Sequence, residues 1–212
     1  MIPERPVRIP GEATLEAALA MPAGAVAGVV VCHPHPRYGG DMDSPVVVTT
    51  VDACAPWGLA TLRFNFRGVG GSSGGWDDGR GEQYDVRAAL HHLRDLLGPS
   101  ARIGLAGYSF GAAMAASVAA GGEPIAGLAL IAPPLASSSW RQPGTLALDG
   151  PVLVVAGSED AYCPSQALAT LATTLPSATV TVIDGADHFF YSGQAELTTA
   201  LAGWAGRLAT SA

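Results

Sequence analysis

The chain has 212 residues, of which 49% are hydrophobic and only 14% are charged. A chain of this length and composition can bury a large core, so we expect one globular domain over residues 1–212 and exclude a disordered protein. The formal net charge of -7 argues against nucleic acids and anionic membranes as partners, because both repel an acidic protein.

The three cysteines, Cys32, Cys54 and Cys163, lie far apart and lack the paired spacing of a metal knuckle or a disulfide framework. Unpaired cysteines fit a reducing compartment, and the N-terminus lacks the basic and then apolar pattern of a secretory signal. No stretch reaches the roughly 18 uninterrupted apolar residues that a membrane span needs. We therefore expect a cytoplasmic protein.

Short β-branched runs alternate with alanine- and leucine-rich stretches, which predicts βαβ units and a mostly parallel sheet with helices on both faces. Near the N-terminus, residues 7–9 and 14–20 flank a turn at Pro10-Gly11 and predict an antiparallel edge hairpin. Further strands are expected at residues 26–32, 60–66, 102–108, 125–131, 152–156 and 179–183. Helices are expected at residues 82–97, 110–120, 165–175 and 194–209, and one near Pro45 that Asp43 or Ser44 caps. The irregular stretches 67–81 and 132–150 are where we expect substrate contacts.

The pattern G-x-S-x-G occurs twice, at Gly107-Tyr108-Ser109-Phe110-Gly111 and at Gly71-Ser72-Ser73-Gly74-Gly75. With 27 glycines in the chain, the pattern alone is weak evidence. Apolar runs lead into and out of the first match, so Ser109 falls at a strand-to-helix turn, where the helix N-terminus directs N–H groups at an anion. The second match adjoins no strand or helix and is interpreted as a flexible loop. A plain helix-capping serine is the alternative for Ser109.

A serine nucleophile needs a base, and the base needs a carboxylate that orients it. The strand at residues 152–156 is followed by Glu159 and Asp160. We prefer Asp160 as the carboxylate and keep Glu159 as the alternative. The next strand ends just before His188, which is the expected base. Serine, acid and histidine then follow in the order that the hydrolase fold uses.

The remaining histidines fit other roles better. His91 and His92 are neighbours within one predicted helix, so at least one faces solvent. His33 and His35 form an H-x-H pair, but no further ligands stand at matching spacing. We therefore expect no metal site and no cofactor.

Acyl transfer forms a tetrahedral oxyanion that two backbone N–H groups stabilise. One donor is expected from Phe110, the residue after the nucleophile. The other should come from the loop after the strand at residues 26–32. Proline has no N–H, so His35, which stands between Pro34 and Pro36, is our choice. Arg37 and Tyr38 are the alternatives. We also expect Arg37, Tyr38, Tyr108 and Phe189 to contact the substrate.

Five segments together resemble the α/β-hydrolase superfamily, and within it the small lidless group similar to dienelactone hydrolases and bacterial carboxylesterases. They are His33-Pro34-His35-Pro36 with Gly39-Gly40, Asn65-Phe66-Arg67-Gly68-Val69-Gly70, the motif around Ser109, Gly157 with Asp160, and Asp187-His188-Phe189. The resemblance implies a three-layer α/β/α sandwich without a separate lid domain, with Ser109, Asp160 and His188 as the triad. Dienelactone hydrolases use cysteine where this chain has Ser109, so their substrate is not implied.

The expected function is that of a carboxylesterase that cleaves small or short-chain acyl esters through an acyl-enzyme, with a small-molecule ester as its partner. Acyl transfer to another acceptor, perhydrolysis or thioester cleavage would use the same triad. A binding protein on an inactive hydrolase scaffold is a further alternative. Nucleotide binding at residues 67–72 is disfavoured, because the spacing misses G-x-G-x-x-G and no helix follows at once.

Overall fold

The computed structural model describes residues 3–138, 140–141 and 148–210. These residues form an eight-stranded sheet with the order β1-β2-β4-β3-β5-β6-β7-β8. The strands are β1 (Glu4–Ile9), β2 (Leu15–Ala20), β3 (Ala27–Cys32), β4 (Ala60–Phe64), β5 (Arg102–Tyr108), β6 (Gly127–Ile131), β7 (Val152–Gly157) and β8 (Ala178–Ile183). The helices are α1 (Pro45–Cys54), α2 (Arg80–Leu97), α3 (Phe110–Ala120), α4 (Ser165–Thr174) and α5 (Gln194–Thr210), with short 3₁₀ turns at Pro36–Tyr38 and Ala55–Trp57.

The sheet is mostly parallel, as predicted. β1 pairs antiparallel with β2, and β2 pairs antiparallel with β4, which confirms the N-terminal hairpin at one edge. From β4 to β8 all neighbouring strands run parallel. The carboxyl ends of the parallel strands therefore share one edge of the sheet, where α/β proteins place their ligands.

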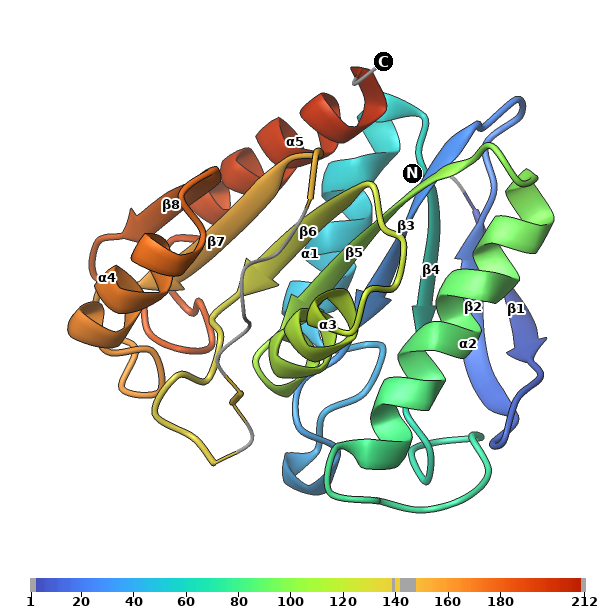
Figure 1. Ribbon diagram of the computed structural model, residues 1–212, viewed down its shortest axis with the longest axis horizontal. Helices are drawn as coiled ribbons and strands as arrows, with labels where there is room; N and C mark the ends of the chain where they lie inside the picture. The colour runs from blue at the N-terminus through green and yellow to red at the C-terminus, as the bar shows by residue number, and fades with distance from the viewer. Residues whose placement is uncertain (1–2, 139, 142–147, 211–212) are drawn as a thin grey trace.

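Helices cover both faces of the sheet, which gives three layers. Figure 1 shows α2, α3 and α4 on the near face and α1 and α5 behind the sheet. Each face has its own apolar core, with Leu90 and Phe110 in the first and Val47 and Trp204 in the second. Because both faces are covered, every residue of β3 is buried, and this explains why its sequence is a continuous apolar run rather than an alternating one.

Ser44 stands at the N-cap of α1, as predicted, although its side chain makes no capping hydrogen bond. The fourth strand ends at Phe64 rather than at residue 66. The N–H of Phe66 instead donates to Nε2 of the buried His33, at 3.0 Å, and so leaves the ladder.

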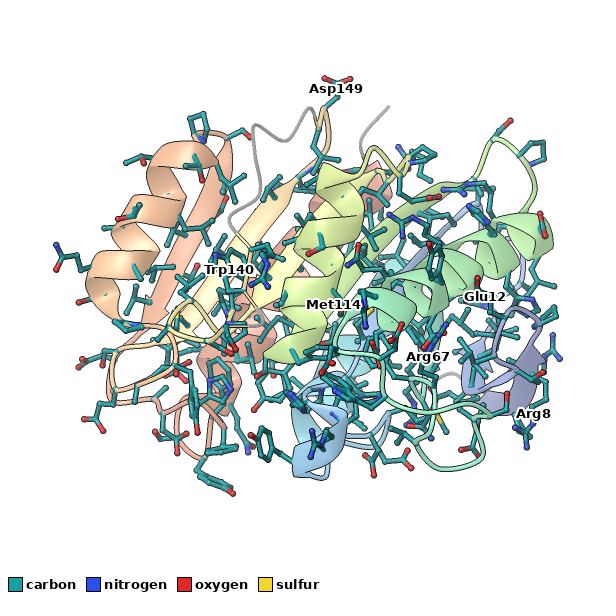
Figure 2. All side chains as sticks on the ribbon, turned by 60° about the horizontal axis from the view of Figure 1, so that its bottom comes forward. Arg8, Glu12, Arg67, Met114, Trp140 and Asp149 are labelled. Carbon is teal, nitrogen blue, oxygen red and sulfur yellow. The ribbon has the colours of Figure 1, made fainter. Side chains whose placement is uncertain are left out.

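The loop that contains the second G-x-S-x-G match was predicted to be flexible, but hydrogen bonds hold it in place. Oγ of Ser73 accepts a hydrogen bond from the N–H of Thr14 at 2.8 Å, and the N–H of Gly71 donates to the Glu16 carboxylate at 2.6 Å. Arg67 pairs with Asp85 of α2 at 2.8 Å. It also approaches Glu12, which Figure 2 labels together with Arg67. Ser73 is therefore a structural residue that ties this loop to the segment before β2.

None of the helices in the described part of the chain combines the length and the apolar character that a membrane crossing requires.

Candidate active site

Ser109 lies in the turn between β5 and α3, in a strained backbone conformation with φ 54° and ψ -117°. At this turn β5, α3 and β3 approach each other very closely. A Cβ atom on Gly107 would lie 2.2 Å from the carbonyl oxygen of Gly111, and one on Gly111 would lie 2.4 Å from that of Cys32. Both motif glycines are therefore required by close backbone contact, and the result is a serine held above the end of β5.

The structure brings together the three residues that the sequence predicted. Oγ of Ser109 lies 2.9 Å from Nε2 of His188, and Nδ1 of His188 lies 2.8 Å from Oδ2 of Asp160. All three side chains come from loops at the carboxyl ends of parallel strands, on the lower side of the sheet in Figure 1. With Nδ1–H donating to the carboxylate, Nε2 is free to accept the serine proton.

Asp160 is fixed on both of its oxygens. Oδ2 faces the imidazole, while Oδ1 accepts the N–H groups of Tyr162 at 2.8 Å and Cys163 at 3.1 Å. Glu159 is exposed, and its N–H donates to the carbonyl oxygen of Ala186. The backbone thus turns Asp160 toward His188, and the structure places Glu159 outside the hydrogen-bonded chain.

The backbone amides of Phe110 and His35 belong to residues that line the same cavity as Ser109. Within the described ranges, neither amide is paired with a protein acceptor. The alternatives for the second donor are already engaged, because the N–H of Arg37 donates to Nδ1 of His35 and that of Tyr38 to the His35 carbonyl oxygen. Of these three N–H groups, only that of His35 has no protein acceptor among the described residues.

Ser109 and His188 line a cavity of about 320 Å³. Of the expected substrate contacts, Tyr38, Tyr108 and Phe189 line it. Arg37 does not, and lines a neighbouring groove instead. The other walls are mainly apolar and aromatic, from Pro45, Val46, Pro134, Tyr162 and Tyr191. Tyr38 and Tyr191 are 86% and 81% exposed, so the cavity opens to solvent at an aromatic rim.

The histidines outside the triad have structural surroundings. Nε2 of His33 accepts from Phe66 and its Nδ1 lies 2.6 Å from the carbonyl oxygen of Pro34, so the proton is on Nδ1. Burial lowers the pKa of His33 to about 4, and the ring is neutral at neutral pH. His91 is exposed and pairs with Glu123 at 3.0 Å. In the described part of the chain, no group of three or more potential ligands gathers to hold a metal ion.

Three sets of contacts that hold Asp160 and His188 were not predicted from the sequence, although Tyr108 was predicted as a substrate contact. The hydroxyl of Tyr108 donates to the carbonyl oxygen of His188, the N–H groups of Tyr162 and Cys163 hold Asp160, and the Tyr162 ring lies 4.7 Å from the imidazole centroid. The side chain of Cys163 is buried in the core, and burial raises the pKa of this thiol to about 12. No sequence pattern predicts which backbone groups will make such contacts.

The comparisons with known proteins agree with this fold. The family model of the alpha/beta hydrolase fold matches residues 29–146, and the chain belongs to that family. A serine hydrolase homologue from Coxiella burnetii is 35% identical, with a TM-score of 0.85 and coverage of 94% of this chain and 96% of that one. An α/β serine hydrolase without a lid from Xanthomonas campestris is 31% identical, with a TM-score of 0.84 and coverage of 99% and 96%. An uncharacterised protein of Rickettsia prowazekii is 33% identical over 180 residues, 81% of this chain and 75% of the relative.

Proposed function

We propose that the protein is a serine carboxylesterase that cleaves esters of small or short-chain acids, with Ser109 as nucleophile, His188 as general base and Asp160 as the orienting carboxylate. The observation that carries the proposal is the continuous chain from Ser109 through His188 to Asp160, with distances of 2.9 and 2.8 Å, at the wall of an open cavity. Membership of the hydrolase fold supports hydrolysis in general.

In the first half of the reaction, Oγ of Ser109 attacks the ester carbonyl carbon while Nε2 of His188 takes the hydroxyl proton. The carbonyl oxygen becomes an oxyanion, which the N–H groups of Phe110 and His35 receive. Each such preorganised donor is worth about 3 kcal/mol in the transition state. The tetrahedral intermediate then expels the alcohol, which takes the proton from His188, and the acyl group stays on Ser109.

In the second half, water replaces the alcohol. His188 takes a proton from the water as its oxygen attacks the acyl carbon, and the same two N–H groups stabilise the second oxyanion. The acid leaves as the bond to Oγ breaks, and Ser109 regains its proton from His188. Asp160 stays ionised and stabilises the imidazolium that exists between the two proton transfers.

The cavity supports a small substrate. The cavity has a volume of about 320 Å³ and opens to solvent at its rim, and its apolar wall can hold a short acyl or alcohol group. Part of the 132–150 stretch lies outside the described residues, at positions 139 and 142–147. Thioesters and acceptors other than water involve the same acyl-enzyme, so the assay panel below includes both.

The test separates Ser109 from the serine of the other G-x-S-x-G match. Labelling with a fluorophosphonate and turnover of short 4-nitrophenyl esters are measured for the wild type, Ser109→Ala and Ser73→Ala, followed by a panel of acyl esters, thioesters and alternative acceptors. We expect Ser109→Ala to lose labelling and turnover while its circular dichroism stays unchanged, and Ser73→Ala to retain both activities. Full activity of Ser109→Ala would end the proposal.

We also propose that the protein works in the cytoplasm. Cys32, Cys54 and Cys163 are buried as free thiols, a state that a reducing compartment maintains. Fractionation of the producing cells tests this, and recovery of the protein outside the cytoplasmic fraction would contradict it.

A further inference from the structure

A second hollow adjoins the proposed active site. It is a groove of about 610 Å³, which we call the arginine groove because Arg37, Arg80 and Arg141 line it. The groove and the catalytic cavity share the wall formed by His35, Tyr38, Phe110 and Ser137. A molecule of moderate length can therefore lie in both at once, on either side of the two proposed oxyanion donors.

The charge of the arginine groove is opposite to that of the whole protein. Its three arginines are among only 11 basic residues in a chain of net charge -7. Asp78 is the acidic residue among the described lining, and its carboxylate accepts a hydrogen bond from Nε1 of Trp76 at 2.7 Å. Within the described residues, no carboxylate forms a salt bridge with Arg37 or Arg141. The groove thus concentrates positive charge on a protein that otherwise repels anions.

The positive charge of Arg80 lies at the helix end where it is electrostatically unfavourable. Arg80 is the first residue of the 18-residue helix α2, where the helix dipole favours negative charge. Its salt bridge to Asp77, at 3.3 Å, joins side chains that are 77% and 45% exposed, and such pairs contribute little. A residue that breaks a local rule without a matching local gain points to a role beyond folding.

The shared wall contains packed aromatic rings and lies close to Arg37. The ring of His35 stacks on Trp76 with centroids 4.7 Å apart and lies 5.0 Å from Phe110. Burial, and next the charge of Arg37, lower the pKa of His35, so the ring is neutral at neutral pH. Figure 2 shows Met114 reaching from α3 toward the start of α2, and Met114 is one of the residues that line the groove.

We propose that the arginine groove binds an anionic group of the substrate, a carboxylate or a phosphate, while the ester bond lies at Ser109 in the adjoining cavity. This inference rests on the proposed esterase function and adds the substrate class. Guanidinium groups match both anions because they donate paired, parallel hydrogen bonds to two oxygens. Gln83 and Ser117, which also line the groove, add neutral donors for the remaining oxygens.

The kinetic test compares anionic esters with neutral esters of similar size. On the alcohol side, 4-acetoxybutanoate and 2-acetoxyethyl phosphate are compared with butyl acetate, which separates carboxylate from phosphate. On the acyl side, monoethyl glutarate is compared with ethyl pentanoate. Acid release is followed in a pH-stat for the wild type, the double variant Arg37→Gln/Arg80→Gln, and Arg5→Gln. Arg5 is exposed on the edge strand β1, and Arg5→Gln controls for removal of a positive charge outside the groove.

We expect the wild type to favour at least one anionic ester over its neutral counterpart by about tenfold in kcat/KM, as charge-assisted hydrogen bonds provide. In the double variant this ratio should fall to below about twofold, and in Arg5→Gln it should stay at the wild-type value. The ratio is independent of the amount of folded enzyme. The inference is overturned if the wild type shows no such preference, if the double variant keeps it, or if Arg5→Gln loses it equally.

A binding experiment keeps this inference separate from the proposed function. Glutarate and inorganic phosphate are titrated into Ser109→Ala protein, with and without the two arginine substitutions, and the indole N–H signal of Trp76 is followed by NMR. We expect the dissociation constant of at least one anion to rise about tenfold when both arginines are replaced. If the dissociation constant rises in this way but the wild-type protein turns over no ester, the esterase proposal fails and the anion site stands. If neither anion moves the Trp76 signal, the anion site fails, whatever the esterase assay shows.

Discussion

The hydroxyl of Tyr108 donates a 3.0 Å hydrogen bond to the carbonyl oxygen of His188, so the residue before the nucleophile holds the backbone of the base. Tyr108 is only 5% exposed. Burial, and next the charge of Asp160, raise the pKa of Tyr108 far above its ordinary value, so the phenol remains a donor even in alkaline solution. One short segment of β5 thus positions two members of the proposed triad.

Replacing Tyr108 by phenylalanine tests this positioning role. The change leaves the His188 carbonyl without its partner, and we expect the free energy of unfolding to fall by about 1 to 2 kcal/mol. Because the imidazole loses its backbone anchor, kcat should fall about tenfold while KM stays near the wild-type value. Steady-state kinetics and urea unfolding measure the two effects. Tyr84→Phe, at an exposed position of α2, is the control. A variant that loses stability but keeps kcat would show that Tyr108 has only a structural role.

The choice between the two neighbouring acids is tested by Asp160→Asn and Glu159→Gln. Asp160→Asn removes the charge that orients the imidazole and stabilises its protonated form, so kcat should fall by about three to four orders of magnitude. Glu159 is exposed and makes no hydrogen bond with His188 among the described residues, so Glu159→Gln should stay within about twofold of the wild type. Rates for a 4-nitrophenyl ester at saturating substrate decide the matter. The opposite pattern would assign the carboxylate to Glu159.

The close approach at the nucleophile turn predicts a large cost for Gly111→Ala. The added methyl carbon would lie 2.4 Å from the carbonyl oxygen of Cys32, and the end of β3 cannot move without disturbing the sheet. We expect the free energy of unfolding in urea to fall by more than about 3 kcal/mol. At Gly75 the same methyl would meet no atom within 4 Å, so Gly75→Ala should be neutral or raise it by about 0.5 kcal/mol. Equal stabilities of the two variants would contradict the packing at this turn.

The buried His33 predicts a loss of stability in mild acid. Its pKa is lowered from 6.5 to about 4, mainly by burial, so the unfolded chain takes up a proton at a higher pH than the folded protein does. Its contribution is complete above pH 6.5 and is lost as the pH falls toward 4, by about 3 kcal/mol. Urea unfolding between pH 7 and 4 should therefore show a steeper decline in the wild type than in His33→Gln.

The control for this pH effect is His91→Gln, since His91 is exposed on α2. It should follow the wild-type decline. If His33→Gln declined as steeply as the wild type, the neutral state of the His33 ring would not be the cause.

Most of the fold could be predicted from local patterns. Buried parallel strands are continuous apolar runs, and Pro10-Gly11 between two short runs predicts the hairpin that β1 and β2 form. Strand ends were less predictable, because Phe66 leaves β4 for a ring that stands 33 positions earlier in the chain. The order in which β4 lies between β2 and β3 is likewise a matter of long-range pairing.

By itself, the amino-acid sequence determined Ser109 and His188 as the candidate nucleophile and base, limited the acid to Glu159 or Asp160, and placed each of them after a strand, because strand patterns and the glycines around Ser109 are local properties. Only the tertiary structure decided that Asp160 rather than Glu159 faces His188, that Ser73 ties a loop to the segment before β2, and that Arg37 lines the neighbouring groove rather than the cavity at Ser109. The physical reason is that these outcomes depend on the direction of side chains and backbone groups between segments far apart in sequence. These directions are set when the whole sheet packs, and no local sequence pattern predicts them.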